Sequence, residues 1–148
     1  MLLDRARLLI TTFWVGSLWA IGYLAAPTLF ATLPDRVLAG TVAGNLFHTE
    51  AWASVVCAVL LLGLQARGKD RKAARKEIWL VVAMLACTLI GYFCLQPFMA
   101  ALRESAGPSG VMESASKTEF AVLHGVSMLF YLVQSVLGVV LVLRKNRS

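Results

Sequence analysis

Two histidines stand in otherwise apolar parts of this sequence, and imidazole is the commonest side-chain ligand for metal ions. They are His48 and His124. Met128 follows His124 by four residues, so a helix would place the imidazole and the thioether on one face. This ligand pair suits a soft metal such as Cu(I), and an imidazole can also bind haem iron. One hypothesis is therefore a metal- or haem-binding redox or transport component that uses His124, His48 and Met128, with the cofactor unknown.

Further polar side chains are expected at the depth of the two histidines. Polar and ionisable residues inside a membrane are costly, so they are candidates for function. Together they predict a polar layer in the outer half of a helix bundle, and our main hypothesis is that this layer binds a small ligand or a partner. The alternatives are hydrogen bonds that only join helices, and a path for protons or substrate. The layer consists of Tyr23, His48, Gln96, His124 and Ser127.

Several function classes find no support in the motifs. The sequence has no P-loop, no GxGxxG or HExxH pattern and no nucleophile–base pair, which favours a protein that is not an enzyme. The net charge is +6, but the basic residues sit between apolar runs and are not interleaved with aromatics, which argues against nucleic acid as a partner. The three cysteines lie within apolar runs and are expected to pack as small hydrophobic residues.

The elements that must position these residues are transmembrane helices. The chain is 59% hydrophobic and 15% charged, against about 45–50% and about 25% in soluble domains. The apolar residues form four runs of about 20 residues, the length that crosses the hydrocarbon of a bilayer. The sequence predicts an all-α integral membrane four-helix up-down bundle in one transmembrane domain, residues 1–148. The expected helices cover about 6–32, 37–65, 78–101 and 119–143, with Asp35 as the N-cap of the second.

Basic residues give the orientation of this bundle. The stretch from Arg67 to Glu77 holds six of the fourteen Lys and Arg residues, and it lies between the second and third helices. Arg5, Arg7 and the last three basic residues fall on the same side of a four-helix bundle, so eleven of the fourteen lie there. Because basic residues favour the cytoplasmic side, both the N and the C terminus are predicted to be cytoplasmic.

Small residues indicate where helices could approach closely. Gly40 and Gly44 are four residues apart, and Gly16 has small residues four positions before and after it. Such spacing lets helices pack tightly in lipid, and Pro27 is expected to kink the first helix. A third hypothesis is therefore a structural subunit that uses these glycines to form a homo-oligomer or to bind a membrane-protein partner.

Three segments resemble the family known as domain of unknown function 4149, which includes proteins similar to transmembrane protein 205. The first is Ala26–Phe30, APTLF; the second is Ala39–Phe47, AGTVAGNLF; the third is Phe120–Ser127, FAVLHGVS. The resemblance implies a small four-helix membrane protein with no established reaction, and it places His124, Gly125 and Ser127 among the site residues. With the short loops, it also implies a location in the bacterial cytoplasmic (inner) membrane.

Overall fold

The computed structural model of the chain describes residues 2–66 and 71–145, and within these residues all regular structure is helical. Four helices are long and apolar enough to cross a membrane. They are Leu2–Thr32, Arg36–Ala66, Arg75–Ser105 and Lys117–Arg144. The predicted all-α membrane bundle is therefore confirmed.

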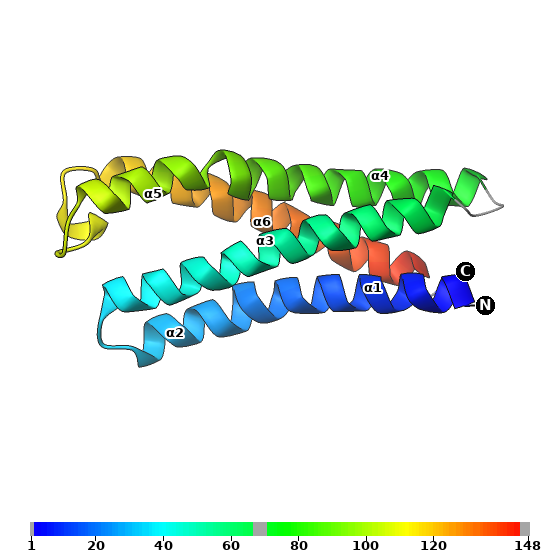
Figure 1. The fold of residues 1–148 in the computed structure, drawn as a ribbon, viewed down its shortest axis with the longest axis horizontal. Helices are drawn as coiled ribbons and strands as arrows, with labels where there is room; N and C mark the ends of the chain where they lie inside the picture. Colours follow the sequence, from blue (N-terminus) through cyan, green and yellow to red (C-terminus); the bar gives the residue numbers. More distant parts are fainter. Residues whose placement is uncertain (1, 67–70, 146–148) are drawn as a thin grey trace.

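Two of these four helices contain a π-helical turn. The first helix consists of α1 (Leu2–Trp19), the π-helix η1 (Ala20–Ala25) and α2 (Ala26–Thr32). The second is α3 (Arg36–Ala66) without interruption. The third consists of α4 (Arg71–Thr88), the π-helix η2 (Leu89–Cys94) and α5 (Gln96–Ser105). A 3₁₀ turn, η3 (Val111–Glu113), precedes α6 (Lys117–Lys145), as Figure 1 shows.

The π-helical turns have a common cause in the prolines that follow them. Proline has no N–H, and its ring collides with the carbonyl four residues earlier. Pro27 and Pro97 each stand in the first two positions of the α-helix after a π-helix. The wider π turn relieves the collision, so the chain continues as a helix across each proline. Near Pro27, the Thr28 hydroxyl donates to the Leu24 carbonyl at 2.7 Å, which helps to satisfy the backbone there.

The turn between α2 and α3 ends in the expected N-cap. The side chain of Asp35 accepts hydrogen bonds from the backbone N–H groups of Val37 at 2.8 Å and Leu38 at 3.1 Å. These two donors have no partner inside the helix, so the aspartate satisfies them. The prediction that Asp35 caps this helix is confirmed.

The chain forms two helical hairpins that lie side by side (Figure 1). Both termini lie at one end of the bundle, which we call the terminal end. The α2–α3 turn and the α5–α6 connection lie at the other, which we call the loop end. Near the terminal end α1 packs on α3 and α6, and α4 packs on the same two helices. Toward the loop end the hairpins diverge, and the contacts are mainly α2 with α3 and α5 with α6.

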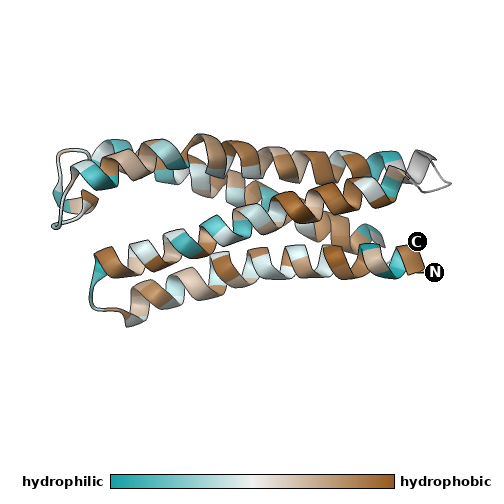
Figure 2. Cartoon of the chain, viewed as in Figure 1, coloured by the Kyte–Doolittle hydropathy of each residue, from teal (hydrophilic) through white to brown (hydrophobic). Residues whose placement is uncertain are grey.

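The dry core lies between the middle of the bundle and the terminal end. All four long helices contribute to one cluster, in which Trp14, Ala58, Leu61, Val81 and Met84 are fully buried and Cys57 and Leu141 nearly so. In Figure 2 the half of α3 nearer the terminal end is mostly brown and apolar, whereas teal, polar residues recur in its half nearer the loop end. The described terminal half is therefore closely packed by apolar side chains.

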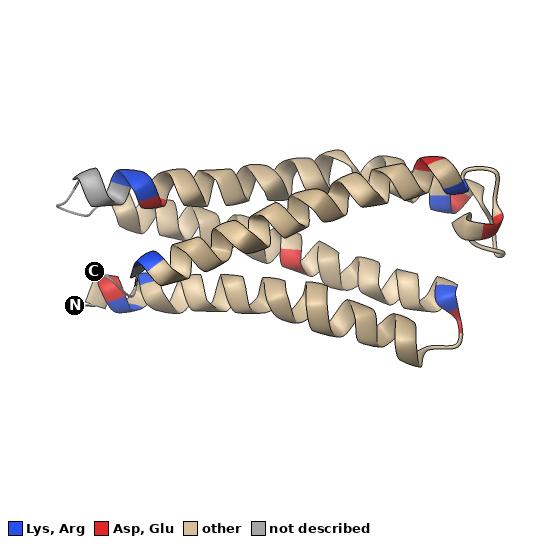
Figure 3. Ribbon diagram, turned by 180° about the vertical axis from the view of Figure 1, so that it is seen from behind, with Lys and Arg blue, Asp and Glu red and all other residues tan. Residues whose placement is uncertain are grey.

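Charged residues lie at the two ends of the bundle, and one acidic position interrupts its uncharged middle part (Figure 3). The basic stretch that was expected as a connection is partly helical, because α4 begins at Arg71. Its first four residues, 67–70, lie outside the described part of the chain.

The glycines that hold helices closely together differ from the expected ones. Nothing lies within 4 Å of a Cβ built on Gly16, and Gly40 and Gly44 meet only distant side-chain atoms. Their packing role therefore stays a prediction about contacts with another molecule. Inside the described part of the chain, a Cβ on a helical glycine would come closest to another helix at Gly22, against the ring of Tyr131, and at Gly91. Pro27, by contrast, acts within the first helix, where it follows the π turn η1.

Candidate ligand pocket

A polar pocket opens between α3 and the second half of the third helix, near the loop end. Its volume is about 540 Å³. We call it the loop-end pocket. The residues that line it are Thr41, Gly44, Asn45 and His48 of α3, Tyr92 of η2, and Gln96, Ala100, Arg103 and Glu104 of α5. Most of these side chains carry a hydrogen-bonding group, which makes this pocket the natural place for a polar ligand.

His48 and Tyr92 form the floor of the loop-end pocket. His48 Nδ1 lies 3.1 Å from the Tyr92 hydroxyl, and the two rings are tilted at 59° to each other. The π turn η2 matters here because it sets the direction in which Tyr92 leaves the third helix. Gln96 lies about one turn further on and lines the same pocket. Two members of the expected polar layer, His48 and Gln96, therefore share one site.

Arg103 gives the pocket a positive charge. Its guanidinium carbon lies 5.1 Å from the centre of the Phe120 ring, a cation–π contact. Phe120 in turn stacks on His124, with ring centres 5.9 Å apart and planes 7° apart. His124 thus stands behind the wall of the pocket and does not line it. Within the part of the chain that the structure describes, no carboxylate forms an ion pair with Arg103.

The remaining expected site residues lie elsewhere. The Tyr23 hydroxyl donates to Ser135 Oγ at 3.0 Å and so joins η1 to α6. Ser127 Oγ donates to the Gly91 carbonyl at 2.7 Å and so joins α6 to η2. Met128 is exposed on the outer surface of α6. The predicted layer is therefore divided among the pocket, its rear wall and two contacts between helices.

The metal centre expected at His48, His124 and Met128 stays a prediction. No group of three or more His, Cys, Asp or Glu among the described residues could hold a metal ion. His48 pairs with a tyrosine and His124 with a phenylalanine.

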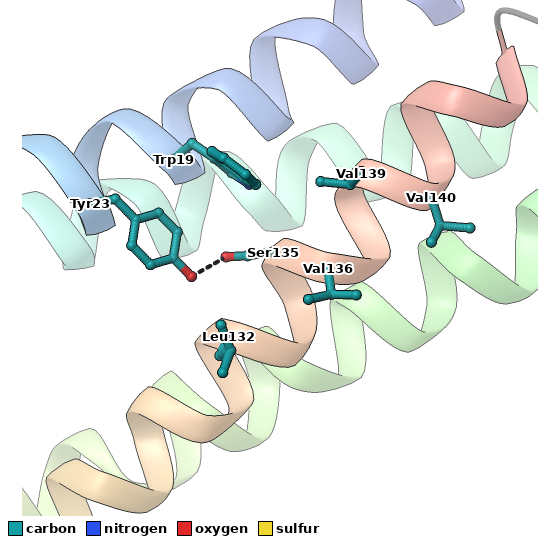
Figure 4. A pocket seen from close by; sticks show the side chains of 7 residues that line it. All are labelled: Trp19, Tyr23, Leu132, Ser135, Val136, Val139 and Val140. Atoms are coloured by element: carbon teal, nitrogen blue, oxygen red, sulfur yellow. Dashed lines mark hydrogen bonds between the residues drawn. The ribbon is translucent and has the colours of Figure 1, made fainter.

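A second pocket, between the first helix and α6, has a different character. Its volume is about 440 Å³, and Figure 4 shows the side chains around it. They are Trp19, Tyr23, Leu132, Ser135, Val136, Val139 and Val140. The polar pair in this set, Tyr23 and Ser135, is engaged in its own hydrogen bond. This pocket has an apolar lining that faces outward from the bundle, so it suits lipid chains rather than a polar ligand.

The centre of the bundle holds a polar cluster that was not predicted from the sequence. Ser54 Oγ accepts a hydrogen bond from Trp14 Nε1 at 2.7 Å and one from Gln134 Nε2 at 3.4 Å. The Ser54 hydroxyl donates to Glu50 Oε1 at 3.3 Å. All four side chains are buried, and they come from α1, α3 and α6. A signal was available, because Glu50 is the only acid in the interior of the four helices expected from the sequence.

Comparisons with known proteins identify a family but no relative of known activity. The family model described as domain of unknown function (DUF4149) matches residues 9–108. No curated protein and no solved structure matches the chain. The matched range includes His48, Glu50, Tyr92 and Arg103, and it ends before α6 begins. Since the match covers well over half of the 148 residues, the chain belongs to the DUF4149 family.

Proposed function

We propose that this chain is a multi-pass protein of the bacterial cytoplasmic membrane that binds a small polar ligand in the loop-end pocket. In this proposal both termini lie in the cytoplasm, because eleven of the fourteen basic residues belong to that side. The loop end then faces the exterior of the cell. The ligand reaches the pocket from the external aqueous phase rather than through the closely packed terminal half.

The observation that carries this proposal is the chemistry of the pocket wall. An apolar bundle has no need of a polar cavity for its own stability, since polar groups in a membrane are costly. Here Asn45, Tyr92 and Gln96 surround a cavity that also holds a guanidinium. Arginine offers five donors in a planar fork that matches a carboxylate or a phosphate. The pocket therefore favours a small molecule with an acidic group, held by Arg103 and oriented by the neutral donors.

Glu104 on the same wall limits the ligands that fit. Its carboxylate repels an anion that approaches it, while it can accept a hydrogen bond from a hydroxyl or an amine. A ligand that carries both an acidic group and a donor would satisfy Arg103 and Glu104 together. Hydroxy acids and amino acids have this pattern, whereas a simple inorganic anion satisfies only the arginine.

Replacing Arg103 with glutamine should weaken this binding. Native mass spectrometry of the purified protein, with inorganic phosphate, short hydroxy acids and amino acids as probes, should detect a one-to-one complex with at least one probe. A hydrogen bond to a charged group contributes about 1.5–3 kcal/mol, so Arg103→Gln should weaken binding about tenfold or more. Arg36→Gln, which changes an exposed arginine outside the pocket, should leave binding unchanged.

Two results would contradict the proposal. One is a wild-type protein that binds none of the probes. The other is a complex that survives equally in Arg103→Gln and Arg36→Gln, because the acidic group would then be held outside the pocket. Equal unfolding temperatures of both variants without ligand would show that the loss in Arg103→Gln is not a folding defect.

A further inference from the structure

Glu50 is buried at the midpoint of a helix that is long enough to cross the membrane. Its side chain is 3% exposed. It stands near the centre of the 31 residues from Arg36 to Ala66, about 20 Å from either end of the helix. A charged side chain at that depth is costly, and such residues are rare in membrane helices. A buried carboxyl in this place therefore needs either a positively charged partner or a proton.

No basic side chain takes the role of partner within the described residues. Arg7, near the terminal end, donates to the Leu64 carbonyl at 2.6 Å and pairs with Asp4. Arg103, near the loop end, stacks on Phe120. The other titratable groups that interact with Glu50 are Tyr131 of α6 and Cys57 of α3, and neither can supply a positive charge.

The elements packed against α3 confirm this picture of the surroundings. From α1, Ser17 reaches the carboxyl and Trp14 donates to Ser54, and both side chains are uncharged. From α6, Gln134 reaches the same cluster through Ser54. On the third helix, Cys87 is a buried free thiol and Tyr92 is hydrogen-bonded to His48. Tyr23 of η1 is bonded to Ser135.

The hydrogen bonds around Glu50 nevertheless suit its ionised form. A hydroxyl can accept two hydrogen bonds and donate one, and Ser54 does all three. It accepts from Trp14 and Gln134 and donates to Glu50. Donors that feed into Ser54 polarise it and strengthen its own bond to the carboxylate. Two opposed influences thus act on one carboxyl, because burial favours the acid and the three-helix donor network favours the carboxylate.

From this balance we infer that Glu50 is a reversible proton-binding site at mid-depth in the bundle. Uptake of a proton converts the carboxylate to a carboxylic acid and removes its charge. Ser54, which joins α1, α3 and α6, therefore donates to a charged carboxylate when Glu50 is ionised and to a neutral carboxyl when Glu50 is protonated. The ligand of this site is the proton itself, and the site is separate from the loop-end pocket, which His48 lines from another face of α3.

Dicyclohexylcarbodiimide tests the site directly, because this apolar reagent reacts with protonated carboxyls in apolar surroundings. The carboxylic acid adds across the carbodiimide, and the adduct rearranges to a stable N-acylurea that peptide mass spectrometry locates. The wild-type protein in detergent should be labelled at Glu50 at low pH. Once the carboxyl is mostly ionised, labelling should fall about tenfold for each further pH unit. Glu50→Gln should lose the label, and Glu119→Gln, at the exposed start of α6, should keep it.

A second variant and a second measurement make the test independent of reagent access. Ser54→Ala removes the donor to the carboxylate, so labelling should persist to higher pH than in the wild type. Infrared difference spectra between low and high pH should show a protonated carboxyl band that is absent from Glu50→Gln. A band that is missing at every pH, or that does not change with pH, would overturn the inference. So would wild-type labelling that is independent of pH or that survives in Glu50→Gln.

Discussion

Trp14→Ala is expected to destabilise the bundle more than any other single truncation, by about 3 kcal/mol. Trp14 is fully buried in the cluster to which all four long helices contribute. Its removal leaves a cavity that the surrounding helices cannot fill. In a membrane the unfolded side chain is surrounded by lipid rather than water, so burying the ring stabilises the bundle less than it would in a soluble protein. The packing contacts that Trp14→Ala removes are lost in either case. The same change also removes the hydrogen bond from Nε1 to Ser54.

Unfolding in mixed micelles, followed by tryptophan fluorescence or circular dichroism, measures this loss. Trp14→Phe keeps most of the ring volume and loses only the hydrogen bond, so it should cost about 1 kcal/mol. Trp79→Ala is the matched control, because Trp79 is 65% exposed. An equal midpoint for Trp14→Ala and Trp79→Ala would show that the central cluster does not hold the helices together.

Gly91→Ala should be the second strongly destabilising change, although it adds only one methyl group. A Cβ at Gly91 would lie 2.8 Å from Phe130 Cβ, which is close to the backbone of α6 and cannot swing away. The helices must separate by a fraction of an ångström, and overpacking of this kind costs about 1–3 kcal/mol. Separation also lengthens the hydrogen bond from Ser127 to the Gly91 carbonyl.

Gly125→Ala provides a control with the opposite sign. Nothing lies within 4 Å of a Cβ at Gly125, so the methyl group meets no neighbour. Alanine has a higher helix propensity than glycine by up to about 1 kcal/mol, and the substitution should stabilise α6 slightly. The same unfolding assay compares the two variants. If Gly91→Ala proved as stable as Gly125→Ala, α6 would not approach η2 at Gly91 as closely as the structure shows.

Much of the fold was predictable because membrane crossing imposes length and composition on each helix. Four apolar runs predicted four spanning helices, and the structure has them. Asp35 was recognised as a cap because its place before an apolar run is a local pattern. The π turns were not foreseen, although a kink at Pro27 was expected. Whether a proline kinks a helix or widens the turn before it depends on how the neighbouring helices pack, and this packing cannot be read from the sequence.

The candidate site was only partly predictable, because the sequence does not show toward which neighbouring helix each side chain points. His48 and Gln96 were expected to share a layer, and they line the same pocket. The third helix was expected to end at about residue 101, which left Arg103 outside it, whereas α5 extends to Ser105. Glu50 was not among the expected site residues. It lies on another face of α3 than His48, and there Ser54 links it to Trp14 and Gln134. These contacts depend on how α1, α3 and α6 pack together, which the sequence alone does not give.

The two proposed sites make separable predictions. The loop-end pocket depends on α3 and α5, and the proton-binding site depends on α1, α3 and α6. Glu50→Gln should therefore leave ligand binding in the pocket intact, and Arg103→Gln should leave carbodiimide labelling of Glu50 intact. If one of the two proposals proved wrong, the other would still stand or fall by its own experiment.

The most direct test of the central claim is the accessibility of the loop-end pocket to an external, membrane-impermeant reagent. In a background in which Cys57, Cys87 and Cys94 are alanine, Asn45→Cys places a thiol on the wall of this pocket. Leu132→Cys places one in the apolar pocket beside α6. A negatively charged thiosulfonate added to intact cells should modify Asn45→Cys and leave Leu132→Cys unmodified. An Asn45→Cys protein that reacts only after the cells are opened, or not at all, would contradict a water-filled binding site that faces the exterior.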